Sequence, residues 1–75
     1  MNRFPAVTAK EVIRVLEKVG FYEHHQKGSH KVFKRDVDRR RVVVPFHSGK
    51  IIPRKTLKSI LTDADLTVEK FRELV

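Results

Sequence analysis

The tripeptide Gly28-Ser29-His30 combines residue types that suit acid–base chemistry on a phosphate. Glycine permits a tight turn and lets backbone N–H groups approach an anion closely. A histidine at the start of the following strand projects from a fixed backbone, and imidazole exchanges protons near neutral pH. The same tripeptide also fits an ordinary turn followed by an exposed histidine. The local pattern therefore leaves both an acid–base site and a plain turn open.

The other three histidines are weaker candidates. His47 follows a short β-branched run, and antiparallel pairing of consecutive strands brings the end of the third strand near the start of the second. It is a candidate second proton-transfer group, with a surface loop histidine as the alternative. His24 and His25 are adjacent, so strand alternation predicts that they face opposite sides and that at most one joins any site.

The residues do not have the pattern of a cofactor or metal site. Zinc sites combine closely spaced histidines or paired cysteines, and this chain has no cysteine. It also contains no P-loop, dinucleotide-binding fingerprint or serine nucleophile elbow. We therefore expect neither a metal ion nor a cofactor.

Positive charge is concentrated in the middle of the chain. The 75 residues carry a net charge of +8, and residues 24–58 hold eleven Lys or Arg against two Asp. A solvated face is the ordinary explanation of such a run. This excess nevertheless favours a surface that binds a polyanion or an acidic protein. Within the run, alternation places Arg41 on one face with Val43, and Arg40 on the other.

Local signals predict the element order α-β-β-β-α-α. The expected elements are a helix over 9–19, strands over 21–26, 30–35 and 41–44, a helix from Pro53 to the Asp63-Ala64-Asp65 break, and a last helix after Thr67. A capping box formed by Thr8 and Glu11 begins the first helix, and Gly20 ends it. The sequence predicts an α+β fold in one domain, residues 1–75. Helices cover one face of an antiparallel sheet, and the other face is free to bind a ligand.

Four segments, in this order and with these gaps, resemble the HicA (YcfA-like) toxin family. They are the helix that ends in Gly20-Phe21, the Gly28-Ser29-His30 turn with Phe33 after it, Val44-Pro45-Phe46-His47, and Thr56-Leu57-Lys58-Ser59-Ile60-Leu61. The resemblance spans roughly residues 6–73, nearly the whole chain. Two positions depart from the usual pattern of the family. Phe46 stands where many members have a basic residue, and no glycine occurs within residues 63–66.

The resemblance implies a fold, an activity and a partner. The family folds like a double-stranded-RNA-binding domain, with a three-stranded antiparallel sheet packed on helices. Its members are mRNA interferases, small endoribonucleases that a HicB antitoxin holds inactive. The histidine of the Gly-Ser-His turn is the catalytic residue of the family, which is His30 in this chain.

This resemblance suggests a metal-independent cleavage of single-stranded RNA in which the 2′-hydroxyl is the nucleophile. His30 would act as acid or base, and His47 is the candidate for the complementary group. The candidate phosphate contacts are Gly28, Ser29, Lys27, Lys31 and Arg41. The same charge would attract an acidic HicB-like antitoxin.

Other functional classes remain alternatives. A non-catalytic RNA-binding module of the same fold needs the basic face but no histidine at the turn. A domain that binds only acidic proteins needs neither. No apolar run in the sequence is long enough for a signal peptide or a membrane span, so we expect a cytoplasmic protein without membrane contact.

Overall fold

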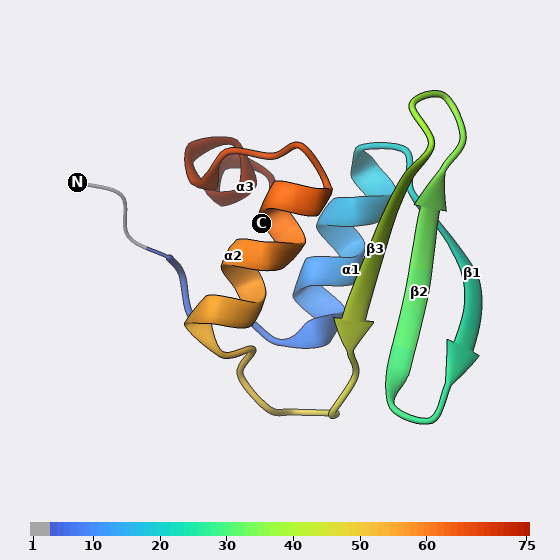
Figure 1. The fold of residues 1–75 in the computed structure, drawn as a ribbon. Helices are drawn as coiled ribbons and strands as arrows, with labels where there is room; N and C mark the ends of the chain where they lie inside the picture. Colours follow the sequence, from blue (N-terminus) through green and yellow to red (C-terminus); the bar gives the residue numbers. More distant parts are fainter. Residues whose placement is uncertain (1–3) are drawn as a thin grey trace.

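A computed structural model describes residues 4–75 and has the expected order of elements (Figure 1). The elements are α1 (Ala9–Lys18), β1 (Tyr22–Lys27), β2 (His30–Arg35), β3 (Arg40–Pro45), α2 (Arg54–Asp63) and α3 (Val68–Leu74). The strands form one antiparallel sheet in the order β1-β2-β3. The α+β class is thereby confirmed, while the likeness to a double-stranded-RNA-binding domain stays a prediction.

The first helix begins and ends as its sequence predicts. The backbone N–H of Thr8 donates to Glu11 Oε1 at 2.9 Å, and the N–H of Glu11 donates to Thr8 Oγ1 at 3.4 Å. Gly20 lies just past the helix with φ of 96°, a left-handed conformation that favours glycine. The capping box and the glycine stop are both confirmed.

One face of the sheet packs on the helices, and Figure 1 shows all three helices on that side. Phe33 of β2 pairs with Val42 of β3, and both side chains are fully buried in the core together with Val44. The helices contribute buried residues to the same cluster, among them Val12, Val15, Leu16, Leu57, Ile60, Leu61 and Phe71. The sheet face that carries His30, Val32 and Lys34 points away from this core, and we call it the open face.

Strand β1 contains one irregularity that alters its faces. Its register with β2 shifts between Glu23 and His25, so that His24 is an extra residue without a partner. The rings of His24 and His25 lie 5.1 Å apart between centroids at 73°. The expectation that these two histidines face opposite sides is wrong, because the bulge interrupts strand alternation between them.

The junction between α2 and α3 contains no glycine, yet one of its residues has a left-handed backbone conformation. That residue is Asp65, with φ of 59°, a conformation that aspartate adopts more readily than most residues. The N–H of Leu66 donates to the carbonyl of Leu61 at 2.9 Å, which closes the end of α2. Within residues 4–75, no helix is long and apolar enough to cross a membrane.

Candidate functional site

The open face of the sheet holds a broad pocket of about 550 Å³, which we call the open-face pocket. It is lined by His25, Lys27, Gly28, His30, Val32, Arg41 and Val43. These residues come from all three strands, so the pocket exists only once the sheet has formed. Its walls combine imidazole rings with basic side chains, and the lining includes no carboxylate.

The turn between β1 and β2 fixes the edge of this pocket. Lys27 pairs with His30 across the two-residue turn, and Gly28 has φ of 59°, as such turns require. The Gln26 side-chain amide donates to the carbonyl of Gly28 at 3.0 Å. The N–H of Phe46 donates to the carbonyl of Ser29 at 2.6 Å. His30 therefore projects from a turn that is held from both neighbouring strands.

The middle of the open-face pocket is apolar. Val32 is only 4% exposed although it lies outside the core cluster, and it pairs with Val43 across the sheet. Arg41 lies two residues before Val43, on the same face. Two imidazoles and two cations around a small apolar patch suit a ligand that is anionic in one part and flat and apolar in another, as a nucleotide is.

The structure brings together part of the predicted set of site residues. Lys27, Gly28, His30 and Arg41 line the open-face pocket. Ser29 lies in the turn beside them, half-buried. Four of the five predicted residues therefore line the pocket, and Ser29 lies in the turn that borders it.

Lys31 and His47 lie elsewhere. The Lys31 ammonium is 3.3 Å from Glu23 Oε1 and 4.8 Å from the centre of the Phe46 ring, on the helix side of the sheet. Phe46, which replaces a basic residue of the family pattern, therefore contacts a cation from another strand. His47 lines two small pockets around the loop after β3, one with Thr8 and the other with Ile51.

His25 is the site residue that sequence reasoning missed. Lys27 of β1 pairs with His30 of β2. The next pair on the same face of the sheet is formed by the residue two positions before Lys27 and the residue two positions after His30. That pair is His25 with Val32, so both line the pocket. The two-residue turn at Gly28-Ser29 carried this information, because turn length fixes the register of a hairpin.

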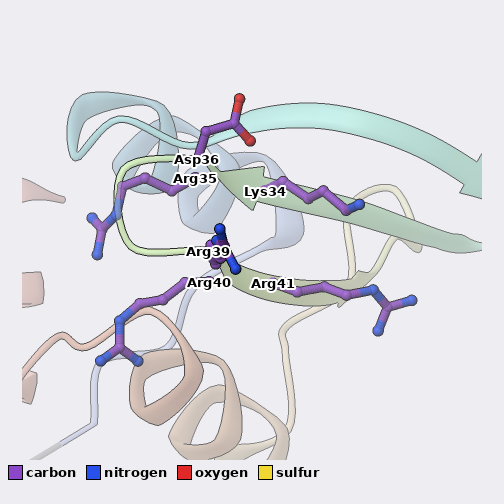
Figure 2. Close-up of a pocket in the computed structure, with 6 residues that line it drawn as sticks. All are labelled: Lys34, Arg35, Asp36, Arg39, Arg40 and Arg41. Atoms are coloured by element: carbon purple, nitrogen blue, oxygen red, sulfur yellow. The ribbon is translucent and has the colours of Figure 1, made fainter.

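The other end of the sheet has a second pocket of about 510 Å³ at the β2–β3 turn, which we call the hairpin pocket. It is lined by Lys34, Arg35, Asp36, Arg39, Arg40 and Arg41. Figure 2 shows the Lys34 and Arg41 side chains extending to one side, Arg35 and Arg40 to the other, and Arg39 between them. Arg41 lines both pockets.

Two of these arginines are tied into the fold through Asp38. Arg35 donates to both carboxylate oxygens of Asp38, at 3.0 and 2.8 Å, and Arg40 Nε donates to one of them at 3.1 Å. The hydrogen bond from Arg35 lowers the pKa of the Asp38 carboxyl, and the same bond raises the pKa of Arg35. Arg35 also donates to the carbonyl of Val19 at 2.7 Å, at the end of α1.

Asp36 lines the hairpin pocket, and its carboxylate is engaged by a tyrosine. The hydroxyl of Tyr22 donates to Asp36 Oδ1 at 2.9 Å, and this bond raises the pKa of Tyr22. In the part of the chain that the structure describes, no three His, Cys, Asp or Glu side chains gather in a group that could hold a metal ion.

Comparison with known proteins identifies the family of this chain. The family model for the HicA toxin of bacterial toxin-antitoxin systems matches residues 9–66, which include both pockets. A search of curated protein sequences finds no match to the chain. Because the family model covers most of its length, the protein belongs to the HicA toxin family and is a toxin of a toxin–antitoxin system.

Proposed function

We propose that this toxin is a metal-independent endoribonuclease that cleaves mRNA, with His30 as its catalytic residue. The open-face pocket carries the proposal. His30 stands there on a braced turn opposite Lys27, and Arg41 lines the same pocket further along the sheet. The family match supports the same activity, since the resemblance that points to the family implies an RNA-cleaving toxin.

RNA brings its own nucleophile, so the protein has to move protons and stabilise charge. The 2′-hydroxyl oxygen attacks the adjacent phosphorus while the bond from phosphorus to the 5′-oxygen breaks. A base accepts the 2′-hydroxyl proton, and an acid donates a proton to the departing 5′-oxygen. The products are a 2′,3′-cyclic phosphate and a 5′-hydroxyl. His30 performs one of these two transfers, a role typically worth about 10²–10⁴ in rate.

His25 is the second imidazole in the same pocket and takes the complementary proton transfer in this proposal. His47 was the sequence-based candidate for that role, but it lines pockets around the loop after β3. Lys27, the direct partner of His30 across the turn, stabilises the negative charge that develops on the phosphate. Arg41 lies further along the same pocket and contacts the RNA strand there. Lys31 is engaged by Glu23 on the other face, so the proposal assigns it no contact with the reacting phosphate.

The partner of this toxin is proposed to be an acidic HicB-type antitoxin that covers the open face. A net charge of +8 on 75 residues attracts such a partner, and the open-face pocket contains no carboxylate that would repel it. Inhibition then follows from competition, because antitoxin and RNA need the same cations.

The test is cleavage of single-stranded RNA in the presence of EDTA by the purified toxin. We expect fragments that end in 2′,3′-cyclic phosphate, and a loss of at least about 10²-fold in rate for His30→Ala. His24→Ala is the control, because it removes an imidazole from the neighbouring strand β1 that does not line the pocket. We expect it to cleave at the wild-type rate.

Three outcomes would contradict the proposal. RNA binding without any fragment would indicate the alternative, a non-catalytic RNA-binding module. Cleavage that EDTA abolishes would indicate a metal-dependent reaction. A folded His30→Ala protein that cleaves as fast as wild type would show that the reaction does not use this imidazole.

A further inference from the structure

The hairpin pocket contains three cations that the fold does not use. Arg35 and Arg40 are bonded to Asp38, as described above. Among residues 4–75, no carboxylate lies within ion-pairing distance of Lys34, Arg39 or Arg41. The carboxylate that lines this pocket, Asp36, accepts a hydrogen bond from Tyr22.

Two of these cations are paired across the sheet, and the third lies in the turn that lines the same pocket. Lys34 and Arg41 are direct partners across β2 and β3 and share the open face. Like charges that face each other across strands destabilise a sheet, and an anion between them removes that repulsion. Arg39 has φ of 57°, a left-handed conformation that non-glycine residues adopt at a cost and that recurs at ligand sites. In Figure 2 the Arg39 side chain is seen nearly end-on, in the space between the two strands.

The hairpin pocket and the open-face pocket adjoin at Arg41, which lines both. Lys34 lies four residues after His30 on the same face of β2. At about 3.3 Å per residue, that separation is about 13 Å. A nucleic acid strand advances about 3.4 Å per nucleotide along a duplex axis, so about four nucleotides of stacked strand span the two pockets.

We propose that the hairpin pocket binds a second phosphate of the RNA strand whose reacting phosphate lies beside His30. Lys34, Arg39 and Arg41 hold this phosphate, and the toxin therefore prefers RNA long enough to reach both pockets. This inference rests on the proposed function for the location of the reacting phosphate. A single phosphate held by three cations also gives binding that weakens as salt rises.

The experiment measures binding separately from cleavage. Fluorescence anisotropy of labelled RNA is recorded with His30→Ala protein, using a trinucleotide and a strand of roughly 12 nucleotides, within the range of single-strand site sizes. The same protein is then measured with Lys34→Gln and Arg39→Gln added. The matched control carries Lys55→Gln and Lys58→Gln, which remove two exposed positive charges from α2.

We expect the Lys34 and Arg39 changes to weaken binding of the longer strand about tenfold or more, since bonds to charged groups are lost. Trinucleotide affinity stays the same, and the control changes both affinities equally and slightly. The dependence of log affinity on log salt becomes shallower by about 0.7 for the longer strand, as loss of one single-strand phosphate contact requires.

Each contrary result has a distinct meaning. Equal losses on both RNA lengths, a loss in the control as large as in the test protein, or no RNA binding at low salt would overturn the hairpin site. Unchanged RNA affinity together with weaker antitoxin binding would make the pocket a protein contact and would also overturn it. Length-dependent binding by a toxin that cleaves no RNA would uphold the hairpin site and overturn the proposed catalysis.

Discussion

Strand β2 has two faces of very different character, although their residues alternate along one six-residue segment. On the helix side, Phe33 is fully buried, Lys31 pairs with Glu23 and Arg35 is bonded to Asp38. On the open side, His30, Val32 and Lys34 make no side-chain hydrogen bond or ion pair within residues 4–75. Alternation thus separates residues that hold the fold from residues that are free to bind.

The comparison teaches that composition alone does not identify a binding residue. Lys31 and Lys34 are the same residue type three positions apart. One is engaged by a carboxylate and an aromatic ring, and the other lines a cationic pocket. Arg35 and Arg41 differ in the same way. The face on which each cation lies decides whether it supports the fold or remains available to a ligand.

The largest expected effect is on stability, from truncation of the aromatic residue on the helix side. Phe33→Ala removes a ring that is 0% exposed in the core, and we expect it to lower the free energy of unfolding by about 3–5 kcal/mol. Val32→Ala, the matched change on the open side, removes two methyl-sized groups and costs at most about 1.6 kcal/mol. Urea unfolding followed by circular dichroism measures both. Equal losses would break the division into two faces.

The next effect concerns catalysis and separates the two remaining histidine candidates. His25→Ala removes the second imidazole of the open-face pocket, and we expect RNA cleavage to slow by about 10²-fold or more. His47→Ala leaves that pocket unchanged, and we expect a loss smaller than about threefold. Initial cleavage rates at saturating RNA measure both, with unfolding curves as a check of the fold. The reverse order of effects would return the complementary role to His47.

Arg35 and Lys34 test the same division with adjacent cations. Arg35→Met keeps an apolar side chain but removes the bonds to Asp38 and Val19 and the guanidinium that lies over the Phe21 ring. We expect a loss of about 2 kcal/mol in unfolding free energy, typical of hydrogen bonds that involve a charged group. Lys34→Met should change stability by less than about 0.5 kcal/mol while it weakens RNA binding. A Lys34 variant as unstable as the Arg35 variant would contradict this contrast.

Much of the fold was predictable because its signals are local. The Thr8–Glu11 capping box, Gly20 and the turn at Gly28 each act within a few residues, and each is found where expected. The stretch before α3 has no glycine, and Asp65 takes a left-handed φ of 59° there. Short polar side chains tolerate left-handed φ, so this turn forms without a glycine.

The candidate site was less predictable because it depends on register and on partners distant in sequence. The bulge at His24 could not be predicted from the alternation of residues along the strand. The engagement of Lys31 by Phe46 and Glu23 also appears only after folding. Four predicted residues, Lys27, Gly28, His30 and Arg41, nevertheless line one pocket. They gather there because hairpin pairing places residues on either side of a short turn on the same face.

The smallest effect is a pH dependence that belongs to the helix side alone. The hydrogen bond from Arg35 holds the pKa of Asp38 below its usual range in the folded protein. A carboxyl with a lowered folded pKa stabilises the fold above its unfolded pKa, near 4. This contribution is lost as the pH falls through the folded pKa. Wild type should therefore lose more stability between pH 6 and about pH 2–3 than Asp38→Asn does.

Urea unfolding at several pH values measures this difference, with Asp63→Asn as the control that removes a carboxylate at the end of α2. The control should retain the wild-type slope, because Asp63 offers only its backbone carbonyl to Arg40. On the open face, Lys34 and Arg41 have no such carboxylate partner among residues 4–75, so their substitution should leave the acid slope unchanged. An acid slope that Asp38→Asn leaves unchanged would mean that the paired arginines are only surface contacts. The two faces of β2 would then differ in burial but not in electrostatics.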